Sequence, residues 1–287
     1  MPRDLRNRSI IITGAGSGIG AATAIACARA GMDVVLCGRR IDRLERVAAR
    51  VHDAGRRAIV RSGDVTEPGL STRLLDAAEE ELGRLDVIFA NAGQALTKPV
   101  VDMSTEELRR LFDVNFFAAV DLLQAAARRL RERDRAGHLL MCSSVAARIA
   151  LPLYGAYAST KAAQSAVCRA MRLEHEGHGI DVSSVHPVTT RTELFATAGD
   201  AGANTHELPA HAVPLFTHAP ERVARGVVRC LQRPAPEVWT SHLVRMVAGF
   251  MTMSPRFGDW SIRRQMAAEQ QAYAARATAD TTRNGPG

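Results

Sequence analysis

The stretch Thr13-Gly-Ala-Gly-Ser-Gly-Ile-Gly20 decides the fold, because it joins a short apolar run to an alanine-rich segment that reaches about residue 30. This order predicts a strand at 8–13, a glycine-rich turn and a helix. Bare backbone lets a pyrophosphate approach closely, and a helix N-terminus supplies N–H groups and partial positive charge. A flexible loop is the alternative, but the flanking elements favour a phosphate site. The residues expected to hold the phosphates are Gly14, Gly16, Ser17, Gly18, Ile19 and Gly20.

Six more short apolar runs follow, and most are separated by segments with helical periodicity. Strands that alternate with helices along a chain are typical of parallel βαβ units. The sequence therefore predicts an α/β fold, a doubly wound, Rossmann-like parallel sheet of about seven strands with helices on both faces. The further strands are expected at about 33–37, 57–61, 85–90, 138–143, 180–186 and 237–239.

The domain organisation is predicted to be simple. We expect one dinucleotide-binding and catalytic domain over residues 1–240, which includes a substrate loop at 188–218. That loop is long and irregular, as lids beside active sites often are, and we expect its Phe195 to contact the substrate. A Met-rich helical extension of the same domain is expected at 241–279, followed by a disordered tail at 280–287.

Composition limits the function classes. The chain has 287 residues, of which 46% are hydrophobic and 23% charged, which is ordinary for a globular protein. Its net charge of +7 comes from arginine, since Lys98 and Lys161 are the only lysines. The arginines are scattered and little interleaved with aromatic residues, so an anionic cofactor explains some of them better than nucleic acid does.

Location and metal content are also predicted. No apolar run is long enough to span a membrane, and the N-terminus leads directly into a strand, so we expect no secretory signal and a cytoplasmic protein. The five cysteines lack close pairs and metal-ligand spacing, which favours reduced thiols. His175 and His178 lie one helical turn apart, but without a third ligand nearby we interpret them as surface residues and expect no metal.

Tyr157-Ala-Ser-Thr-Lys161 carries the candidate chemistry. Apolar residues at helical spacing follow it, and positions i and i+4 of a helix share one face. The Tyr157 hydroxyl and the Lys161 ammonium can therefore face the same small volume. A nearby cation favours the phenolate and lowers the pKa of a tyrosine, which makes it an acid/base near neutral pH. A surface pair without chemistry is the alternative.

The cofactor is expected to be NADP(H) in preference to NAD(H). About twenty residues after the glycines, an NAD site places an acidic residue against the ribose 2′-hydroxyl. This chain has Arg39 and Arg40 there instead. A guanidinium can pair with a 2′-phosphate through two hydrogen bonds. The alternative is that one arginine only stacks on adenine or points into solvent.

Several motifs together resemble the short-chain dehydrogenase/reductase family over residues 7–235. They are the spacing Gly14-x-x-x-Gly18-x-Gly20, the Asn-Ala-Gly at 91–93, Ser144 at a strand end, and Tyr157-x-x-x-Lys161. The resemblance implies reversible hydride transfer between a nicotinamide and a carbonyl/alcohol pair. In it, Tyr157 exchanges the proton, Ser144 stabilises the substrate oxygen, and Lys161 lowers the tyrosine pKa and holds the nicotinamide ribose.

The resemblance implies two further groups of contacts. A distorted helix at Asn115 is expected to hold a water linked to Lys161, which suggests a proton route to Tyr157; a solvated polar face is the alternative. The loop after residue 186 is expected near the nicotinamide, although Val188 replaces the usual glycine. Asp64 is expected either to contact adenine or to cap a turn. The cofactor residues implied are Asp64, Val65, Asn91, Ala92, Gly93, Tyr157, Lys161, Pro187, Val188, Thr190 and Thr192.

The substrate is predicted to be apolar and small, since the loop at 145–154 is mostly apolar and lies between the two catalytic motifs. The residues expected to contact it are Gln94, Ser144, Val145, Leu151, Tyr154, Tyr157 and Phe195. A catalytically silent nucleotide-binding regulatory or scaffold protein is the main alternative, and an isomerase or epimerase is another. We expect no nucleic-acid partner and a homodimer or homotetramer through the helices at about 104–133 and 156–176.

Overall fold

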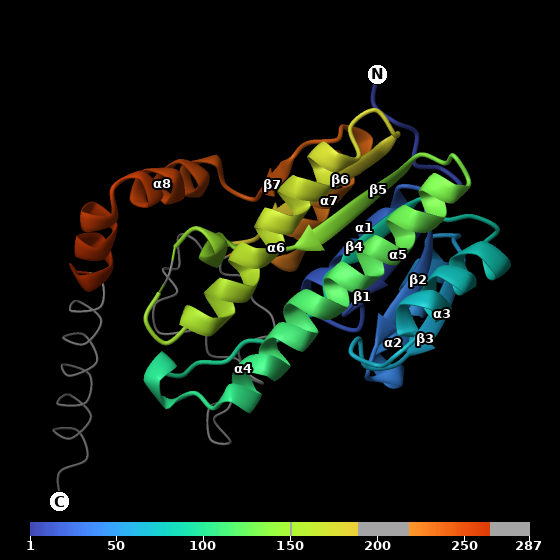
Figure 1. Cartoon of the computed structure of the whole chain (residues 1–287). Coiled ribbons are helices and arrows are strands. Elements are labelled where there is room, and N and C mark those ends of the chain that lie inside the picture. Colours follow the sequence, from blue (N-terminus) through green and yellow to red (C-terminus); the bar gives the residue numbers. More distant parts are fainter. Residues whose placement is uncertain (150, 189–217, 265–287) are drawn as a thin grey trace, which may run out of the picture.

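The computed structural model describes residues 1–149, 151–188 and 218–264 (Figure 1). Thr190, Thr192, Phe195, most of the predicted substrate loop and the predicted tail lie outside these residues. The described part contains a seven-stranded sheet in the order β3-β2-β1-β4-β5-β6-β7, and every neighbouring pair of strands is parallel. The predicted doubly wound α/β fold is therefore confirmed. The strands are β1 (Ser9–Thr13), β2 (Asp33–Gly38), β3 (Ala58–Ser62), β4 (Val87–Ala90), β5 (Gly137–Cys142), β6 (Ile180–His186) and β7 (Glu237–Trp239).

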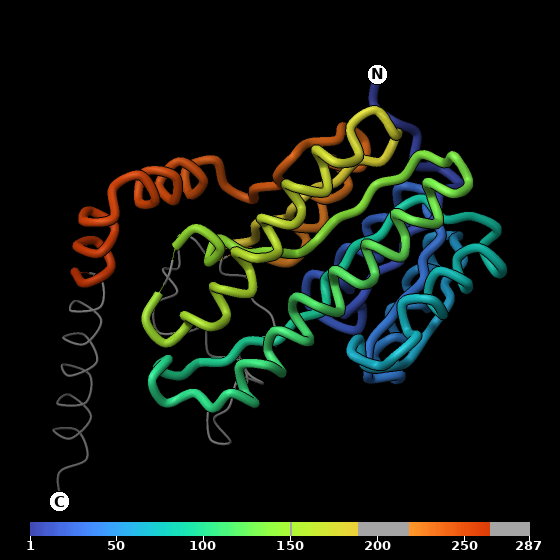
Figure 2. Tube along the Cα trace, in the orientation of Figure 1, coloured from blue at the N-terminus to red at the C-terminus, as the bar shows by residue number. Residues whose placement is uncertain are grey.

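Helices cover both faces of the sheet (Figures 1 and 2). One core joins buried side chains of α1, α2 and α7 to the sheet, and the other joins those of α3, α5 and α6 to its opposite face. Burial on both faces explains why the strands read as continuous apolar runs rather than alternating ones. The α-helices labelled in Figure 1 are α1 (Gly18–Arg29), α2 (Ile41–Asp53), α3 (Leu70–Asp76), α4 (Thr105–Phe112), α5 (Ala118–Glu132), α6 (Gly155–Glu174), α7 (Pro220–Gln232) and α8 (His242–Met253).

The strand order creates the place where a ligand binds. The chain runs outward from β1 to β3 on one side, then returns to β4 and runs outward to β7 on the other. In open parallel sheets, ligands bind beyond the carboxyl ends of the strands where the direction reverses. In this chain that point lies between β1 and β4, next to the glycine-rich turn.

The predicted long helix at 104–133 is interrupted. It begins with a capping box, in which the Ser104 hydroxyl accepts from the Glu107 N–H and the Glu107 carboxylate accepts from the Ser104 N–H. A π-helical segment, Asp113–Phe117, then separates α4 from α5 and has the buried Asn115 at its centre. A second π-helical segment, Ala77–Glu81, follows α3.

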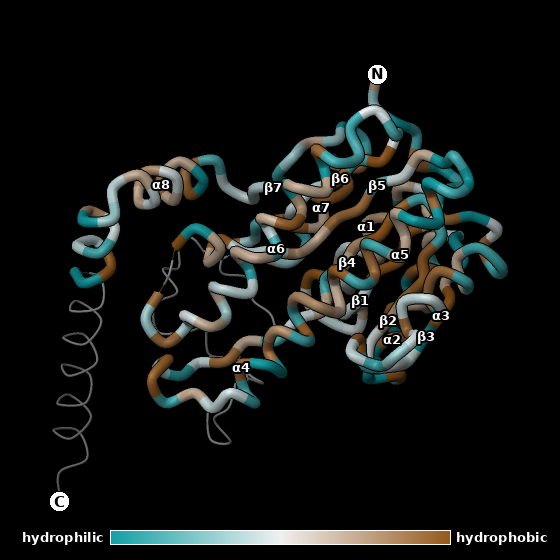
Figure 3. Tube along the Cα trace, viewed as in Figure 1, coloured by the Kyte–Doolittle hydropathy of each residue, from teal (hydrophilic) through white to brown (hydrophobic). Residues whose placement is uncertain are grey.

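Helix α8 continues the chain past β7 and lies away from the sheet (Figure 1). Its hydroxyl cap is Ser241, which accepts from the Val244 N–H. Apolar side chains recur at helical spacing on its exposed side, and Figure 3 shows this end of the chain as mixed in hydropathy. The exposed large apolar residues of α8 are Leu243, Met246, Val247, Phe250 and Met253. No helix in the described ranges has the length and apolar character needed to cross a bilayer. The division at residue 240 stays a prediction.

Candidate active site

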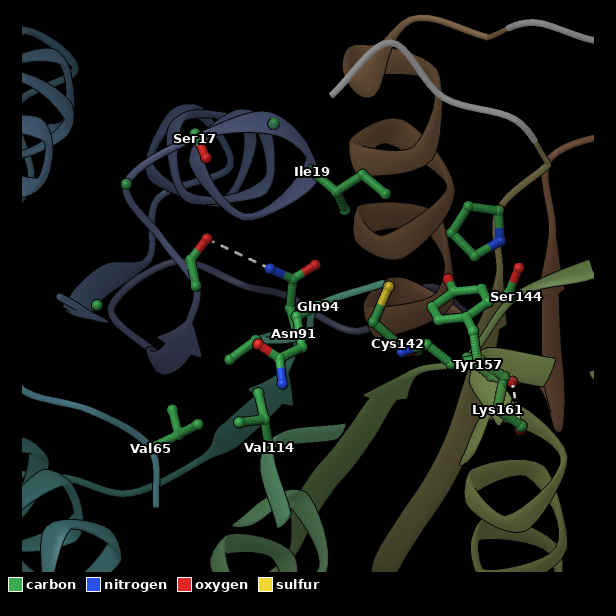
Figure 4. A pocket seen from close by; sticks show the side chains of 18 of the residues that line it. Ser17, Ile19, Val65, Asn91, Gln94, Val114, Cys142, Ser144, Tyr157 and Lys161 are labelled. Carbon is green, nitrogen blue, oxygen red and sulfur yellow. Dashed lines mark hydrogen bonds between the residues drawn. The ribbon is translucent and has the colours of Figure 1, made fainter. Parts of the chain in front are cut away.

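One elongated cavity of about 450 Å³ runs beside the carboxyl ends of the strands. Its volume falls within the ordinary range for small-molecule and cofactor pockets. Figure 4 shows Ser17 and Val65 toward one end and Tyr157, Ser144 and Lys161 at the other. Most of the predicted residues line it, namely Gly14, Gly16, Ser17, Gly18, Ile19, Arg39, Arg40, Asp64, Val65, Asn91, Ala92, Gly93, Gln94, Ser144, Val145, Leu151, Tyr154, Tyr157, Lys161, Pro187 and Val188.

The glycine-rich turn lines the expected phosphate end of the cavity with backbone atoms. Gly14 has φ +65°, which favours glycine, and a Cβ on Gly20 would lie 2.2 Å from the Gly14 carbonyl oxygen. Gly20 therefore permits the close packing behind the turn and does not itself line the cavity. Helix α1 starts at Gly18 with no acidic residue in its first turn, so its partial positive charge is left for an anion. These features fit the pyrophosphate of a dinucleotide.

Asn91 ties the turn to the neighbouring strand. Its backbone N–H and that of Ala92 both donate to the Thr13 hydroxyl, each at 3.0 Å, and its side-chain amide donates to the Thr13 carbonyl at 3.0 Å. These bonds join the ends of β1 and β4 at the switch point. The Asn-Ala-Gly segment thus holds the floor of the cavity in place.

Basic side chains surround the end of β2. Arg39 and Arg40 are exposed and line the cavity, and one Arg40 guanidinium nitrogen lies 3.4 Å from the Ser17 hydroxyl. Partial burial acts to raise the pKa of Asp64, but hydrogen bonds from Thr66 and the charges of Arg39 and Arg110 outweigh it and lower that pKa. The Asp64 carboxylate accepts from the Thr66 N–H and hydroxyl, as expected for a turn cap. This end of the cavity suits an anion.

Tyr157 and Lys161 share one face of α6, as the i, i+4 spacing predicts. The Lys161 Nζ lies 5.5 Å from the centroid of the Tyr157 ring, and both side chains are buried. The side chain of Ser144, which follows β5, lies beside Tyr157 at the same end of the cavity (Figure 4). Three groups from two elements therefore converge on one end of the cavity.

Burial determines the protonation of this cluster. It raises the pKa of Tyr157 above its ordinary value, although hydrogen bonding by the Ser144 side chain opposes the change. It also lowers the pKa of Lys161 to about 8. The sequence argument expected the ammonium to lower the tyrosine pKa, and in this structure the cost of burying a phenolate outweighs that effect. Tyr157 therefore holds a proton that it can donate.

Asn115 lies behind the cavity rather than on its wall. Its side-chain oxygen accepts from the Gln94 N–H at 2.8 Å, and its amide donates to the Gln94 carbonyl at 2.9 Å and the Thr160 hydroxyl at 3.1 Å. These bonds attach the interrupted helix to the loop after β4 and to α6. Full burial and these three side-chain hydrogen bonds exclude the alternative of a solvated polar face. The expected water link to Lys161 stays a prediction.

Some lining residues were missed by the sequence argument. Arg110 and Val114 come from the interrupted helix, and the Cys142 side chain points into the cavity (Figure 4). Little in the sequence indicates that these residues line the cavity, because only the tertiary packing decides which face of each element meets the site. Burial raises the pKa of the Cys142 thiol to about 11, so this residue is a neutral wall at physiological pH.

Comparisons with known proteins agree with this geometry. The family model for short chain dehydrogenases matches residues 8–202. A glycine betaine reductase of Emericella nidulans is 34% identical over 231 residues, which are 80% of this chain but only 18% of that protein. The 1-deoxy-11-beta-hydroxypentalenate dehydrogenase of Streptomyces exfoliatus is 37% identical over 192 residues, which are 66% of this chain and 70% of that one.

Solved structures also match. A short-chain dehydrogenase from Mycobacterium paratuberculosis bound to NAD is 28% identical, with a TM-score of 0.69, covering 80% of this chain and 92% of that one. An alcohol dehydrogenase from Thermococcus sibiricus complexed with 5-hydroxy-NADP is 27% identical, with a TM-score of 0.67 and the same coverage. The chain therefore belongs to the short-chain dehydrogenase/reductase family, and it is an oxidoreductase acting on alcohol and carbonyl groups.

Proposed function

We propose that the protein is an NADP(H)-dependent oxidoreductase that interconverts an apolar ketone or aldehyde and its alcohol, with Tyr157 as the general acid/base. The observation that supports this most is the convergence of Tyr157, Ser144 and Lys161 at the end of a cavity whose other end suits an anion. A pocket with a nucleotide end and an acid/base end is what hydride transfer to a carbonyl requires.

Side chains of this protein supply the proton that the reduced carbonyl oxygen needs. A bound nicotinamide dinucleotide supplies or accepts the hydride. As negative charge develops on the carbonyl oxygen, Ser144 stabilises that oxygen by hydrogen bonding and Tyr157 donates its proton to it. The raised pKa of Tyr157 keeps the phenol protonated before the reaction, and the Lys161 ammonium stabilises the phenolate that is left after donation. In alcohol oxidation the same phenolate accepts the proton.

Arg39 and Arg40 support the NADP(H) part of the proposal. Both line the cavity at the end of β2, where the ribose attached to adenine is expected. The only acidic cavity-lining residue of the described chain is Asp64, whose carboxylate is already bound by Thr66. A 2′-phosphate is therefore met by two guanidinium groups, while the Asp64 carboxylate is occupied by its hydrogen bonds to Thr66.

The proposal that the substrate is apolar rests on the cavity walls near Tyr157. Val145, Ala146, Leu151 and Val188 line this end, and Tyr154 adds an aromatic surface. Burial raises the pKa of the Tyr154 phenol, although a hydrogen bond to Thr97 opposes the change, so Tyr154 is neutral at physiological pH. No ionised group among the described lining residues at this end, apart from Lys161, favours a charged substrate.

The test compares Tyr157→Phe with Tyr154→Phe, since both change a cavity tyrosine in the same way. The first should lower kcat/KM for NADPH-dependent reduction of a hydrophobic carbonyl panel by about 10³-fold, within the range for a general acid. The second should change it less than about tenfold, as expected for a wall residue. NADPH affinity, measured by fluorescence, should be almost unchanged in both. Near-full activity of Tyr157→Phe would show the assignment to be wrong.

The same panel tests the alternative of a silent nucleotide-binding protein. That alternative predicts NADPH binding to the wild-type protein with no oxidation of it by any carbonyl compound. The convergence of Ser144 and Lys161 on the buried Tyr157 favours the enzyme, because a binding-only protein has no need of a buried phenol at this place.

A homodimer or homotetramer is proposed as the working form. Phe117, on the interrupted helix, and Leu173, on α6, are 58% and 60% exposed. Both side chains lie on the helices that are expected to contact a second copy. Large apolar side chains that are this exposed support self-association. Light scattering on the purified chain measures the state directly.

A further inference from the structure

Gln164 connects the catalytic lysine to the interrupted helix. It lies three residues after Lys161 on α6 and is fully buried. Its side-chain oxygen accepts from the Lys161 Nζ at 3.1 Å. Its side-chain nitrogen donates to the backbone carbonyl of Asn115, at the centre of the π-helical segment. The Gln164 amide therefore forms a hydrogen bond through its oxygen to Lys161 and another through its nitrogen to the Asn115 carbonyl.

The Asn115 carbonyl is a natural partner for this amide. A π-helical segment interrupts the regular i→i+4 ladder, so a carbonyl within it is available to a side chain. A buried carbonyl without a donor is costly, and Gln164 supplies that donor. The Asn115 side chain is already bonded to Gln94 and Thr160, which fixes the carbonyl in position.

Few hydrogen bonds stabilise the charged form of Lys161. An ammonium has three donors, and the structure gives two of them to neutral oxygens, the Cys142 carbonyl at 2.8 Å and the Gln164 amide. No carboxylate in the described ranges forms an ion pair with it. The titratable groups that face it are Tyr157 on α6 and the neutral Cys142 thiol on β5, while the π-helical segment contributes the uncharged Asn115. A buried cation requires such hydrogen bonds.

We propose that Gln164 is a positioning residue, which keeps the Lys161 ammonium protonated and aimed at the Tyr157 side of the cavity. The proposal rests on the proposed function, since it assigns a role within that reaction. An amide has no group that ionises near neutral pH, so it cannot relay a proton between Asn115 and Lys161. The Gln164 amide therefore positions the lysine and does not itself carry the proton.

Two substitutions separate this role from simple packing. Gln164→Met keeps the volume and removes the acceptor, so the ammonium loses a hydrogen bond and the pKa of Lys161 should fall by about one unit or more. Gln164→Glu keeps an acceptor and adds negative charge, so the pKa of Lys161 should rise by about one unit or more. A packing role predicts no such opposite shifts.

The chain offers an unusually clean measurement, because Lys98 and Lys161 are its only lysines. Labelling the chain with lysine carrying ¹³C at Cε gives two NMR signals, which Lys98→Arg assigns. Lys98 pairs with Glu107 and serves as the internal control. The Lys161 signal should titrate lower in Gln164→Met and higher in Gln164→Glu than in the wild type, while the Lys98 signal stays unchanged. Superimposable Lys161 titrations in all three proteins would overturn the proposal.

A second readout joins the titration to the reaction. The high-pH limit of carbonyl reduction should move to lower pH in Gln164→Met and to higher pH in Gln164→Glu, following the Lys161 titration. Opposite NMR shifts with unmoved pH profiles would refute the catalytic part. The NMR titration needs no turnover, so failure of the proposed function, seen with Tyr157→Phe, is distinguished from failure of this inference. If Gln164→Met does not fold, Gln164→Glu alone still gives a signed result.

Discussion

The two ends of the cavity are built in different ways. At the nucleotide end, beside β1 to β3, the contacts are backbone groups of the glycine-rich turn and exposed arginines. At the catalytic end, beside β5 and β6, they are side chains, of which Tyr157 and Lys161 are buried and Lys161 donates to the Cys142 carbonyl and the Gln164 amide. The first end therefore depends on close approach to bare backbone and on exposed charge, and the second depends on the identity of particular side chains. They should therefore respond differently to substitution and to pH.

The largest effect is expected where the backbone is packed most closely. In Gly20→Ala the new Cβ would meet the Gly14 carbonyl oxygen at 2.2 Å, so the turn must shift. Overpacking of this kind costs about 1–3 kcal/mol, and because the shift lies under the phosphate site we expect NADPH affinity to fall by about 100-fold. Isothermal titration calorimetry measures this loss.

The matched control for that variant is Gly249→Ala in α8, where an added Cβ meets nothing within 4 Å. It should leave affinity unchanged and slightly stabilise the helix, as alanine does relative to glycine. Equal affinities of Gly20→Ala and the wild type would contradict the view that backbone approach specifies this end.

The next effect concerns cofactor choice. Replacing Arg39 and Arg40 together by alanine should weaken NADPH binding by about 10–100-fold, since a charge-assisted hydrogen bond contributes about 1.5–3 kcal/mol. NADH binding should change less than about threefold. The control is Arg46→Ala, which removes an arginine paired with Asp42 outside the cavity. Equal losses for the two cofactors would mean that these arginines do not select the 2′-phosphate.

The smallest effect is graded and comes from two buried histidines on β5 and β6, neither of which lines the cavity. Burial lowers the pKa of His138 on β5 to about 4, and that of His186 on β6 to about 4. Between about pH 6.5 and 4 the unfolded chain binds protons that these folded histidines do not, so stability falls as pH falls. Each histidine contributes at most about 1.4 kcal/mol per pH unit to that fall.

Urea unfolding at pH 7, 6 and 5 measures the slope. His138→Gln should flatten it, while His52→Gln on the exposed side of α2 should leave it as in the wild type. The His138 Nε2 lies 2.8 Å from the Ser183 hydroxyl, so some stability is lost at every pH in His138→Gln. The diagnostic quantity is therefore the slope and not the absolute stability. Equal slopes of stability against pH in the wild type and His138→Gln would show that His138 does not cause the pH dependence.

Much of the fold and site follows from local patterns. The glycine spacing, the apolar strand runs and the i, i+4 pair of Tyr157 and Lys161 each depend on neighbours in sequence, so they were predictable. Arg110 and Gln164 were not, because their roles depend on how α4 and α6 rotate against the sheet. The raised pKa of Tyr157 also escaped prediction, since the extent of burial is a property of the assembled core.

The position of β1 has a consequence for synthesis of the chain. Ile10, Ile11 and Ile12 are fully buried, and their β4 partners, Val87 to Phe89, come much later in the chain. At ordinary ribosomal speeds of about 5–20 residues per second, roughly 4–15 s separate the emergence of these two strands. During that interval an isoleucine-rich strand has an open edge in the nascent protein. The centre of the finished sheet is thus the segment that has to be shielded longest from wrong pairing while the protein is being made.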